Sequence, residues 1–133
     1  MILLDTNICI YIINEKPPAV LQRFQHYQLG EIGLCSVVAA ELAFGVAKSG
    51  SPRNRQALEM FLAPLTILPF DHPAAWAYGD LRADLERRGT PIGSLDTMIA
   101  AHALSLQARL ITNNTREFAK VPGLLLENWV PAS

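Results

Sequence analysis

The chain has 133 residues, of which 50% are hydrophobic and 17% charged, with eleven lysines and arginines against twelve aspartates and glutamates. This length predicts one domain over residues 1–133, and the high apolar content excludes intrinsic disorder. The formal charge of −1 gives no overall basic signal of a nucleic-acid partner.

Strand-like and helix-like patterns alternate from the first residues onward. Ile2 to Leu4 is a short apolar run that predicts a buried strand, which ends at Asp5. A short helix is predicted over residues 7–14, and the two prolines that follow end it and begin the next helix. The later predicted elements, in chain order, are helix 18–27, strand 32–35, helix 37–49 capped by Ser36, helix 53–62, strand 66–70, helix 72–88 capped by Asp71, helix 95–106 capped by Ser94, strand 109–112 and strand 124–127.

Strands that alternate with helices are typical of a parallel sheet covered on both faces. We therefore expect an α/β fold with three layers and a central parallel sheet of four to five short strands. No apolar run approaches the roughly 20 residues that a membrane crossing needs, and the N-terminus lacks the basic region of a signal peptide. These features predict a cytoplasmic protein without membrane association, in which Cys9 and Cys35 are reduced and packed.

Three acidic residues stand in sequence contexts where a charge is costly. Asp5 follows the first predicted strand, and ligand crevices form at the carboxyl ends of strands in open α/β sheets. Glu41 lies within the almost entirely apolar helix 37–49, where a buried carboxylate needs a partner or a cation. Asp96 lies in the first turn of helix 95–106, where the helix N-terminus favours a negative charge. Asp5 and Asp96 have an alternative interpretation as helix caps.

A divalent metal site would explain all three acids together. If these carboxylates meet in the fold, their mutual repulsion requires a divalent cation. An all-oxygen ligand set favours Mg²⁺ or Mn²⁺ over zinc. Sites of this kind hydrolyse phosphodiesters, because the metal activates water, orients the phosphate and stabilises the leaving oxygen. The residues alone therefore favour metal-dependent phosphoester hydrolysis.

Four motifs, taken in order, resemble those of one nuclease family. They are Ile2-Leu-Leu-Asp5-Thr6-Asn7, Ser36-Val-Val-Ala-Ala-Glu41-Leu42, Gly89-Thr-Pro-Ile-Gly-Ser-Leu-Asp96-Thr-Met-Ile-Ala-Ala-His102-Ala103 and Leu110-Ile-Thr112-Asn113-Asn114-Thr-Arg-Glu117-Phe118. Together with the closing Glu127-Asn-Trp129 they cover essentially the whole chain. In this respect the chain resembles the PIN-domain ribonucleases, specifically the VapC toxins of bacterial toxin–antitoxin pairs.

The resemblance implies a Mg²⁺- or Mn²⁺-dependent endoribonuclease in which Asp5, Glu41 and Asp96 form the acidic metal site. Thr6 matches a family position whose hydroxyl supports that site. Many members have a fourth acid where this chain has Asn114, an amide that can offer a carbonyl oxygen but no charge. Glu117 is a candidate to replace that acid.

The resemblance also implies partners. RNA would be the substrate, with tRNA and the anticodon stem-loop of initiator tRNA as the leading candidates, and its cleavage would inhibit translation. A VapB-type antitoxin would neutralise the enzyme, and a homodimer would form a higher oligomer with it. The apolar stretches 8–13 and 42–46 are interpreted either as buried helices in a small core or as surfaces for the second copy or the antitoxin.

Other interpretations stay open. A haloacid-dehalogenase-like phosphatase also begins with an aspartate after its first strand, but needs a second aspartate where this chain has Asn7. A catalytically weak PIN module that only binds partners or RNA is the main alternative, because Asn114 replaces an acid. His102 is interpreted as a packed histidine and not as a general base. The arginines at 53–55 and 82–88 are either a solvated face or a local RNA-facing patch.

Overall fold

The computed structural model describes residues 1–132 and contains the predicted alternation of strands and helices. Its strands are β1 (Ile2–Leu4), β2 (Ile32–Cys35), β3 (Thr66–Leu68), β4 (Arg109–Ile111) and β5 (Leu125–Glu127). Its helices are α1 (Thr6–Asn14), α2 (Pro18–Gln25), the 3₁₀ turn η1 (Leu29–Glu31), α3 (Ser36–Ser49), α4 (Pro52–Leu62), α5 (His72–Arg87), α6 (Ser94–Leu106) and α7 (Thr115–Phe118). The turn η1 and the helix α7 were not predicted, because three or four residues are too few to show a periodicity.

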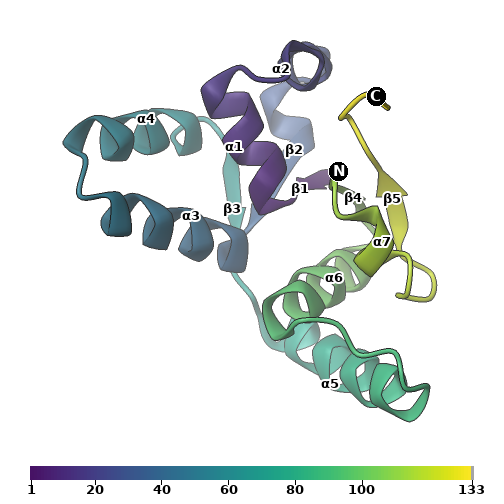
Figure 1. The fold of residues 1–133 in the computed structure, drawn as a ribbon. Helices are drawn as coiled ribbons and strands as arrows, with labels where there is room; N and C mark the ends of the chain where they lie inside the picture. The colour runs from purple at the N-terminus through teal and green to yellow at the C-terminus, as the bar shows by residue number, and fades with distance from the viewer. Residues whose placement is uncertain (133) are drawn as a thin grey trace.

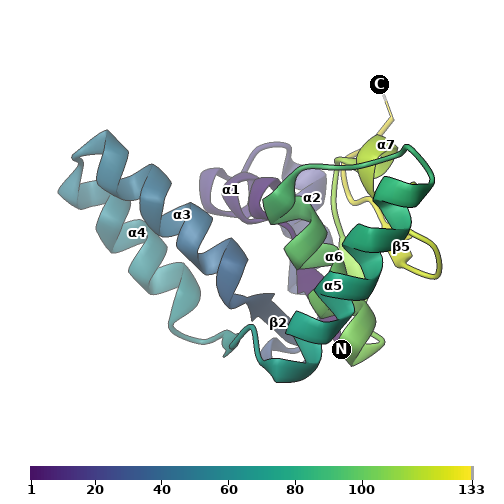
Figure 2. The same cartoon turned by 90° about the horizontal axis from the view of Figure 1, so that it is seen from below.

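The five strands form one parallel sheet in the order β3-β2-β1-β4-β5 (Figure 1). Because crossovers between parallel strands are right-handed, the change of direction after β3 places α1 to α4 on one face and α5 to α7 on the other. Figure 2 shows the α3–α4 hairpin and the α5–α6 pair on opposite sides of the molecule. The predicted α/β fold, with a parallel sheet covered on both faces, is confirmed. Among the helices of residues 1–132, none has both the length and the apolar character of a membrane span.

The helix starts agree with the sequence prediction more closely than the caps do. Asp71 caps α5 as predicted, since its side chain accepts a backbone N–H in the first turn at 3.1 Å. The capping roles predicted for Ser36 and Ser94 are wrong, because each serine is already the first helical residue and its predecessor holds the cap position. The hydroxyl of Ser36 instead accepts from the Phe70 N–H at 3.0 Å. This bond ties the start of α3 to the segment after β3.

A buried polar contact joins the end of β2 to α6. Nδ1 of His102 lies 2.9 Å from Sγ of Cys35, and both side chains are almost fully buried. Burial lowers the pKa of His102 and raises the pKa of the Cys35 thiol. A neutral ring and a protonated thiol can therefore form a hydrogen bond. The interpretation of His102 as a packed residue, and of Cys9 and Cys35 as free, buried thiols, is confirmed.

Candidate metal centre

The carboxyl ends of β1 and β4 mark the point where the strand order reverses. Asp5 directly follows β1, and Thr112 directly follows β4. The Asp5 N–H donates to the Ile111 carbonyl at 2.9 Å, so the bonding between these strands continues as far as Asp5. Open α/β sheets bind their ligands at such a point. The first predicted acid therefore lies where the fold favours a site.

Asp5 is 6% exposed, and both oxygens of its carboxylate accept hydrogen bonds. Oδ1 accepts from the Thr6 N–H at 2.8 Å, so Asp5 is also the N-cap of α1. Oδ2 accepts from the Thr112 hydroxyl at 2.7 Å. Burial raises the pKa of Asp5, and these two hydrogen bonds oppose the rise. The interpretation of Asp5 as a helix cap is correct. Both oxygens of its carboxylate still have lone pairs that a ligand can use.

Glu41 approaches Asp5 from α3. Its Oε1 accepts from the Thr6 hydroxyl at 2.7 Å, so Thr6 contacts Asp5 through its backbone and Glu41 through its side chain. The expectation that Glu41 lies on a buried helix is wrong, because α3 leaves the sheet with α4 as a hairpin (Figure 1) and buries only three of its residues. Glu41 itself is half-buried. The apolar sequence of α3 thus provides exposed apolar surface next to a charged site.

Asp96 lies in the first turn of α6 and meets the other residues through Asn114. Nδ2 of Asn114 lies 3.5 Å from Oδ2 of Asp96, and the Asn114 N–H donates to the Thr112 hydroxyl at 2.9 Å. Asp96 is not a helix cap, since the cap position of α6 belongs to Gly93. A path of hydrogen bonds therefore joins every predicted site residue in the order Glu41, Thr6, Asp5, Thr112, Asn114 and Asp96.

The acids of this path act on one another electrostatically. The pKa of Asp96 is raised from 3.8 to about 6, first by burial and then by the negative charges of Asp5, Glu41 and Glu117. Glu117, the candidate for the fourth acid, lies on α7 and forms an ion pair with Lys120 at 3.2 Å. Four carboxyl groups from four segments therefore share one region of negative potential.

The donor chemistry of this region fits a divalent cation. Within residues 1–132, no three acidic, histidine or cysteine side chains converge tightly enough to form a metal cage of their own. Asp5, Glu41 and Asp96 nevertheless offer hard carboxylate oxygens, and Asn114 offers a neutral amide oxygen. The repulsion that raises the pKa of Asp96 is of the kind that a bound cation relieves. Oxygen donors of this kind suit Mg²⁺ or Mn²⁺.

Thr112 is the residue of this region that sequence reasoning did not select. Its side chain is fully buried, and its hydroxyl donates to Asp5 and accepts from Asn114. Its position at the end of predicted strand 109–112 was an available signal, because the carboxyl ends of parallel strands gather at one edge. The sequence pattern does not reveal which strand lies beside β1, so it could not place Thr112 next to Asp5.

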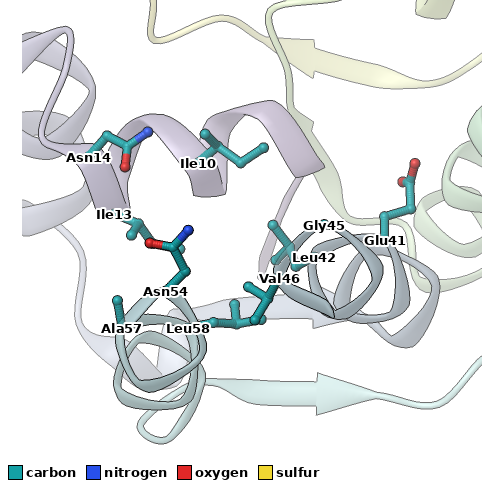
Figure 3. A pocket seen from close by; sticks show the side chains of 10 residues that line it. All are labelled: Ile10, Ile13, Asn14, Glu41, Leu42, Gly45, Val46, Asn54, Ala57 and Leu58. Atoms are coloured by element: carbon teal, nitrogen blue, oxygen red, sulfur yellow. The ribbon is translucent and has the colours of Figure 1, made fainter. Parts of the chain in front are cut away.

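An apolar groove of about 290 Å³ lies between α1, α3 and α4 (Figure 3). Glu41 stands at its end on α3, and its carboxylate points away from the cavity (Figure 3). The stretches 8–13 and 42–46, interpreted as either buried helices or docking surfaces, both contribute walls, so part of each is accessible. The lining side chains are Ile10, Ile13, Asn14, Glu41, Leu42, Val46, Asn54, Ala57 and Leu58, together with Gly45.

Known proteins are similar to this chain in both sequence and structure. The sequence profile described as PIN domain matches residues 2–124. The chain is 45% identical over 128 residues to the tRNA(fMet)-specific endonuclease VapC of Shigella flexneri, covering 96% of each chain. It is 42% identical over 129 residues to Ribonuclease VapC2 of Rickettsia felis, again covering 96% of each chain. The crystal structure of DNA-bound VapBC from Salmonella typhimurium superposes with a TM-score of 0.91 at 41% identity, over 98% of this chain and 100% of the other.

Proposed function

This chain belongs to the PIN domain family, and from that membership we propose that it is the ribonuclease toxin of a VapBC-type toxin–antitoxin pair. It hydrolyses RNA phosphodiester bonds with Mg²⁺ or Mn²⁺ and thereby inhibits translation, and a VapB-type antitoxin neutralises it. Residues 1–133 form a single domain that acts in the cytoplasm. Its relatives of 45% and 42% identity are named as an endonuclease and a ribonuclease, which supports the activity.

One observation carries the metal-dependent reaction. The hydrogen-bond path from Glu41 to Asp96 brings together acids from α3, from α6 and from the position directly after β1, at the carboxyl edge of the sheet, where burial and like charge raise the pKa of Asp96 to about 6. A fold that keeps such mutually repelling acids together gains from a cation that all of them contact. Asp5, Glu41 and Asp96 are therefore the residues that would hold it.

The other residues of the path position these ligands. Thr6 orients Glu41 through its hydroxyl, and Thr112 orients Asp5 through its own. Asn114 holds Asp96 by its amide and, as a neutral group, adds no charge to the site. When bound, the metal supplies positive charge to the phosphate and polarises the attacking water. The protein contributes rigid placement, because each ligand has a partner in the fold.

Transfer RNA is the proposed substrate class, and the anticodon stem-loop of initiator tRNA is the first substrate to test. The support is the printed function of the Shigella relative, a tRNA(fMet)-specific endonuclease, over 96% of both chains. The loop 89–93, the segment Thr112-Asn-Asn114 and the ending Glu127-Asn-Trp129 also resemble the subgroup of VapC toxins that cleaves initiator tRNA in its anticodon stem-loop.

Removal of divalent metal should abolish cleavage. We expect the purified chain to cut initiator tRNA in Mg²⁺ or Mn²⁺, to lose all detectable activity in EDTA, and to regain it when excess Mg²⁺ is added back. The readout is the appearance of two fragments on a denaturing gel, with Ca²⁺ as the control cation. Undiminished cleavage in EDTA would contradict the metal-dependent mechanism. RNA binding without cleavage in any of these cations would favour the catalytically weak PIN module.

The apolar groove between α1, α3 and α4 is the proposed docking site of the antitoxin. It is about 290 Å³ in volume, and its end is marked by Glu41, so an occupant would lie next to the acids of the site. The Salmonella and Rickettsia structures that superpose on this chain are complexes named VapBC, which supports a VapB-type partner.

A charge in that groove should weaken antitoxin binding without removing the nuclease activity. We expect Val46→Asp to raise the Kd for the VapB-type antitoxin by at least about tenfold, because an unpaired carboxylate would be buried at the contact. Isothermal titration calorimetry measures the Kd, and cleavage of free RNA should continue. Met60→Asp on α4 is the matched control, since Met60 is 70% exposed and does not line the groove. An unchanged Kd for Val46→Asp would place the antitoxin elsewhere.

A further inference from the structure

Most basic side chains of this protein already have an acidic partner. Six of its arginines and one lysine form ion pairs, and these neutralise most of the arginines at 53–55 and 82–88 that were candidates for an RNA-facing patch. Within residues 1–132, four of the eleven basic residues of the chain have no carboxylate within 4.0 Å, namely Lys16, Lys48, Arg53 and Arg116.

Of these four, Arg116 lies nearest in the chain to residues of the candidate metal centre, whereas Lys48 shares α3 with Glu41 but stands seven residues after it. It stands between Asn114, whose amide contacts Asp96, and Glu117, whose charge raises the pKa of Asp96. Phe118 is fully buried beneath α7, and Arg116 lies about 200° around the helix from it, so the guanidinium points to solvent. Its exposure agrees with this placement.

The surroundings of Arg116 make its lack of a partner informative. Acids are concentrated here, yet the carboxylate of Glu117 pairs with Lys120 at 3.2 Å and leaves Arg116 without one. The negative charges of Asp5, Glu41 and Asp96 repel the phosphates of an approaching RNA, except where a bound cation would neutralise those charges. A guanidinium beside the acids can bind a phosphate bidentately and offset that repulsion.

We propose that Arg116 is a substrate-binding residue, which holds an RNA phosphate next to the one that is cleaved. This inference rests on the proposed ribonuclease function and adds a specific contact to it. Arg116 would then hold the neighbouring phosphate, while a cation held by Asp5, Glu41 and Asp96 would supply positive charge at the phosphate that is cleaved. Because such a contact exists before and during the reaction, its loss should act on substrate binding more than on turnover.

The test measures RNA binding and cleavage as a function of salt. In an Asp5→Asn background, which should not cut, the Kd for a fluorescein-labelled anticodon stem-loop RNA is measured by anisotropy between low and moderate KCl. We expect Arg116→Ala to raise the Kd about tenfold and to reduce the slope of log Kd against log salt by about 0.7, the value of one phosphate contact. Arg116→Lys should keep the slope and recover part of the affinity, because it keeps the charge but not the bidentate geometry.

Arg53→Ala is the matched control, because Arg53 is also exposed and has no carboxylate partner within residues 1–132 but lies on α4. With Asp5 intact, Arg116→Ala should raise KM about tenfold and change kcat by less than about threefold. An unchanged Kd and slope for Arg116→Ala, or an equal effect of Arg53→Ala, would overturn the proposal. Failure of the unmodified chain to cut RNA would instead overturn the ribonuclease function on which it rests.

Discussion

Replacement of Asp5 by asparagine is expected to lower the rate of RNA cleavage by at least about 1,000-fold, or about 4 kcal/mol of transition-state stabilisation. Asp5 is the most buried acid of the site, and it stands at the reversal of strand order between β1 and β4. The substitution removes one charged ligand but keeps an amide of the same shape. The Asn oxygen can still accept from the Thr6 N–H, so α1 keeps its cap.

The fold should therefore tolerate Asp5→Asn. Burial raises the pKa of Asp5, which means that its ionised form is disfavoured in the fold and a neutral amide is not. Circular dichroism and thermal unfolding should show a melting temperature at least equal to that of the unmodified protein in EDTA. Asp80→Asn is the matched control, because Asp80 is exposed on α5 and should leave the rate unchanged. Cleavage by Asp5→Asn within about tenfold of the normal rate would show that Asp5 holds no essential metal.

Asp96→Asn is expected to inactivate the enzyme and, at the same time, to stabilise the metal-free fold at neutral pH. The pKa of Asp96 is about 6 in the folded chain against 3.8 for an ordinary aspartate. Between these two values the folded state binds more protons than the unfolded state, so the free energy of unfolding falls as the pH rises from 3.8 to 6. Above pH 6 the ionised Asp96 destabilises the metal-free fold by about 1 kcal/mol, once solvent screening of a half-buried group is allowed for.

The measurement is thermal unfolding of both proteins in EDTA at pH 7.5 and at pH 3.5. We expect Asp96→Asn to melt roughly 3 °C higher at pH 7.5 and to lose most of this gain at pH 3.5, where Asp96 is protonated in the folded state and mostly protonated in the unfolded state. Added Mg²⁺ should raise the melting temperature of the unmodified protein and leave that of the variant nearly unchanged. A lower melting temperature for the variant at pH 7.5 would contradict the idea that the acids repel one another in the metal-free fold.

The fold was largely predictable because its strands are short apolar runs with clear ends. The bounds predicted for β1 and β2 are those observed, and the helix that follows Asp71 begins at its predicted cap. The serine caps before α3 and α6 were predicted wrongly, because serine at a helix start can also bond to a distant backbone, as Ser36 does to Phe70. Local patterns do not reveal such tertiary partners.

The residues of the site could be predicted from the sequence, but their arrangement in space could not. The motifs identified Asp5, Glu41 and Asp96, but only the strand order places the end of β1 beside the end of β4 and so brings Thr112 to Asp5. The two interpretations of the apolar stretch 42–46, as a buried helix or as a docking surface, could not be separated from the sequence for a related reason. An apolar helix sequence is compatible both with a helix buried in the core and with a helix whose apolar side chains line a groove. Helix α3 is of the second kind, since Val46 lines the groove.

Arg116 illustrates why net charge alone is a poor guide to nucleic-acid binding. The formal charge of −1 gave no sign of a nucleic-acid partner. Most basic side chains are paired with acids, so the charges that can act on RNA are those of the few unpaired basic residues. At this site the acids collect on one edge of the sheet, and Arg116 lies beside them without a carboxylate partner in residues 1–132. Net charge therefore says less about RNA binding than the placement of a few residues does.

Mapping the 5′ ends of cellular RNA after brief induction tests the proposed function most directly. The unmodified protein should produce discrete new ends within the anticodon stem-loop of initiator tRNA, and the Asp5→Asn variant, expressed to the same level, should produce none. New ends confined to other RNAs would keep the ribonuclease and reject the tRNA. An absence of new ends with the unmodified protein, or the same ends with Asp5→Asn, would contradict a ribonuclease centred on Asp5, Glu41 and Asp96.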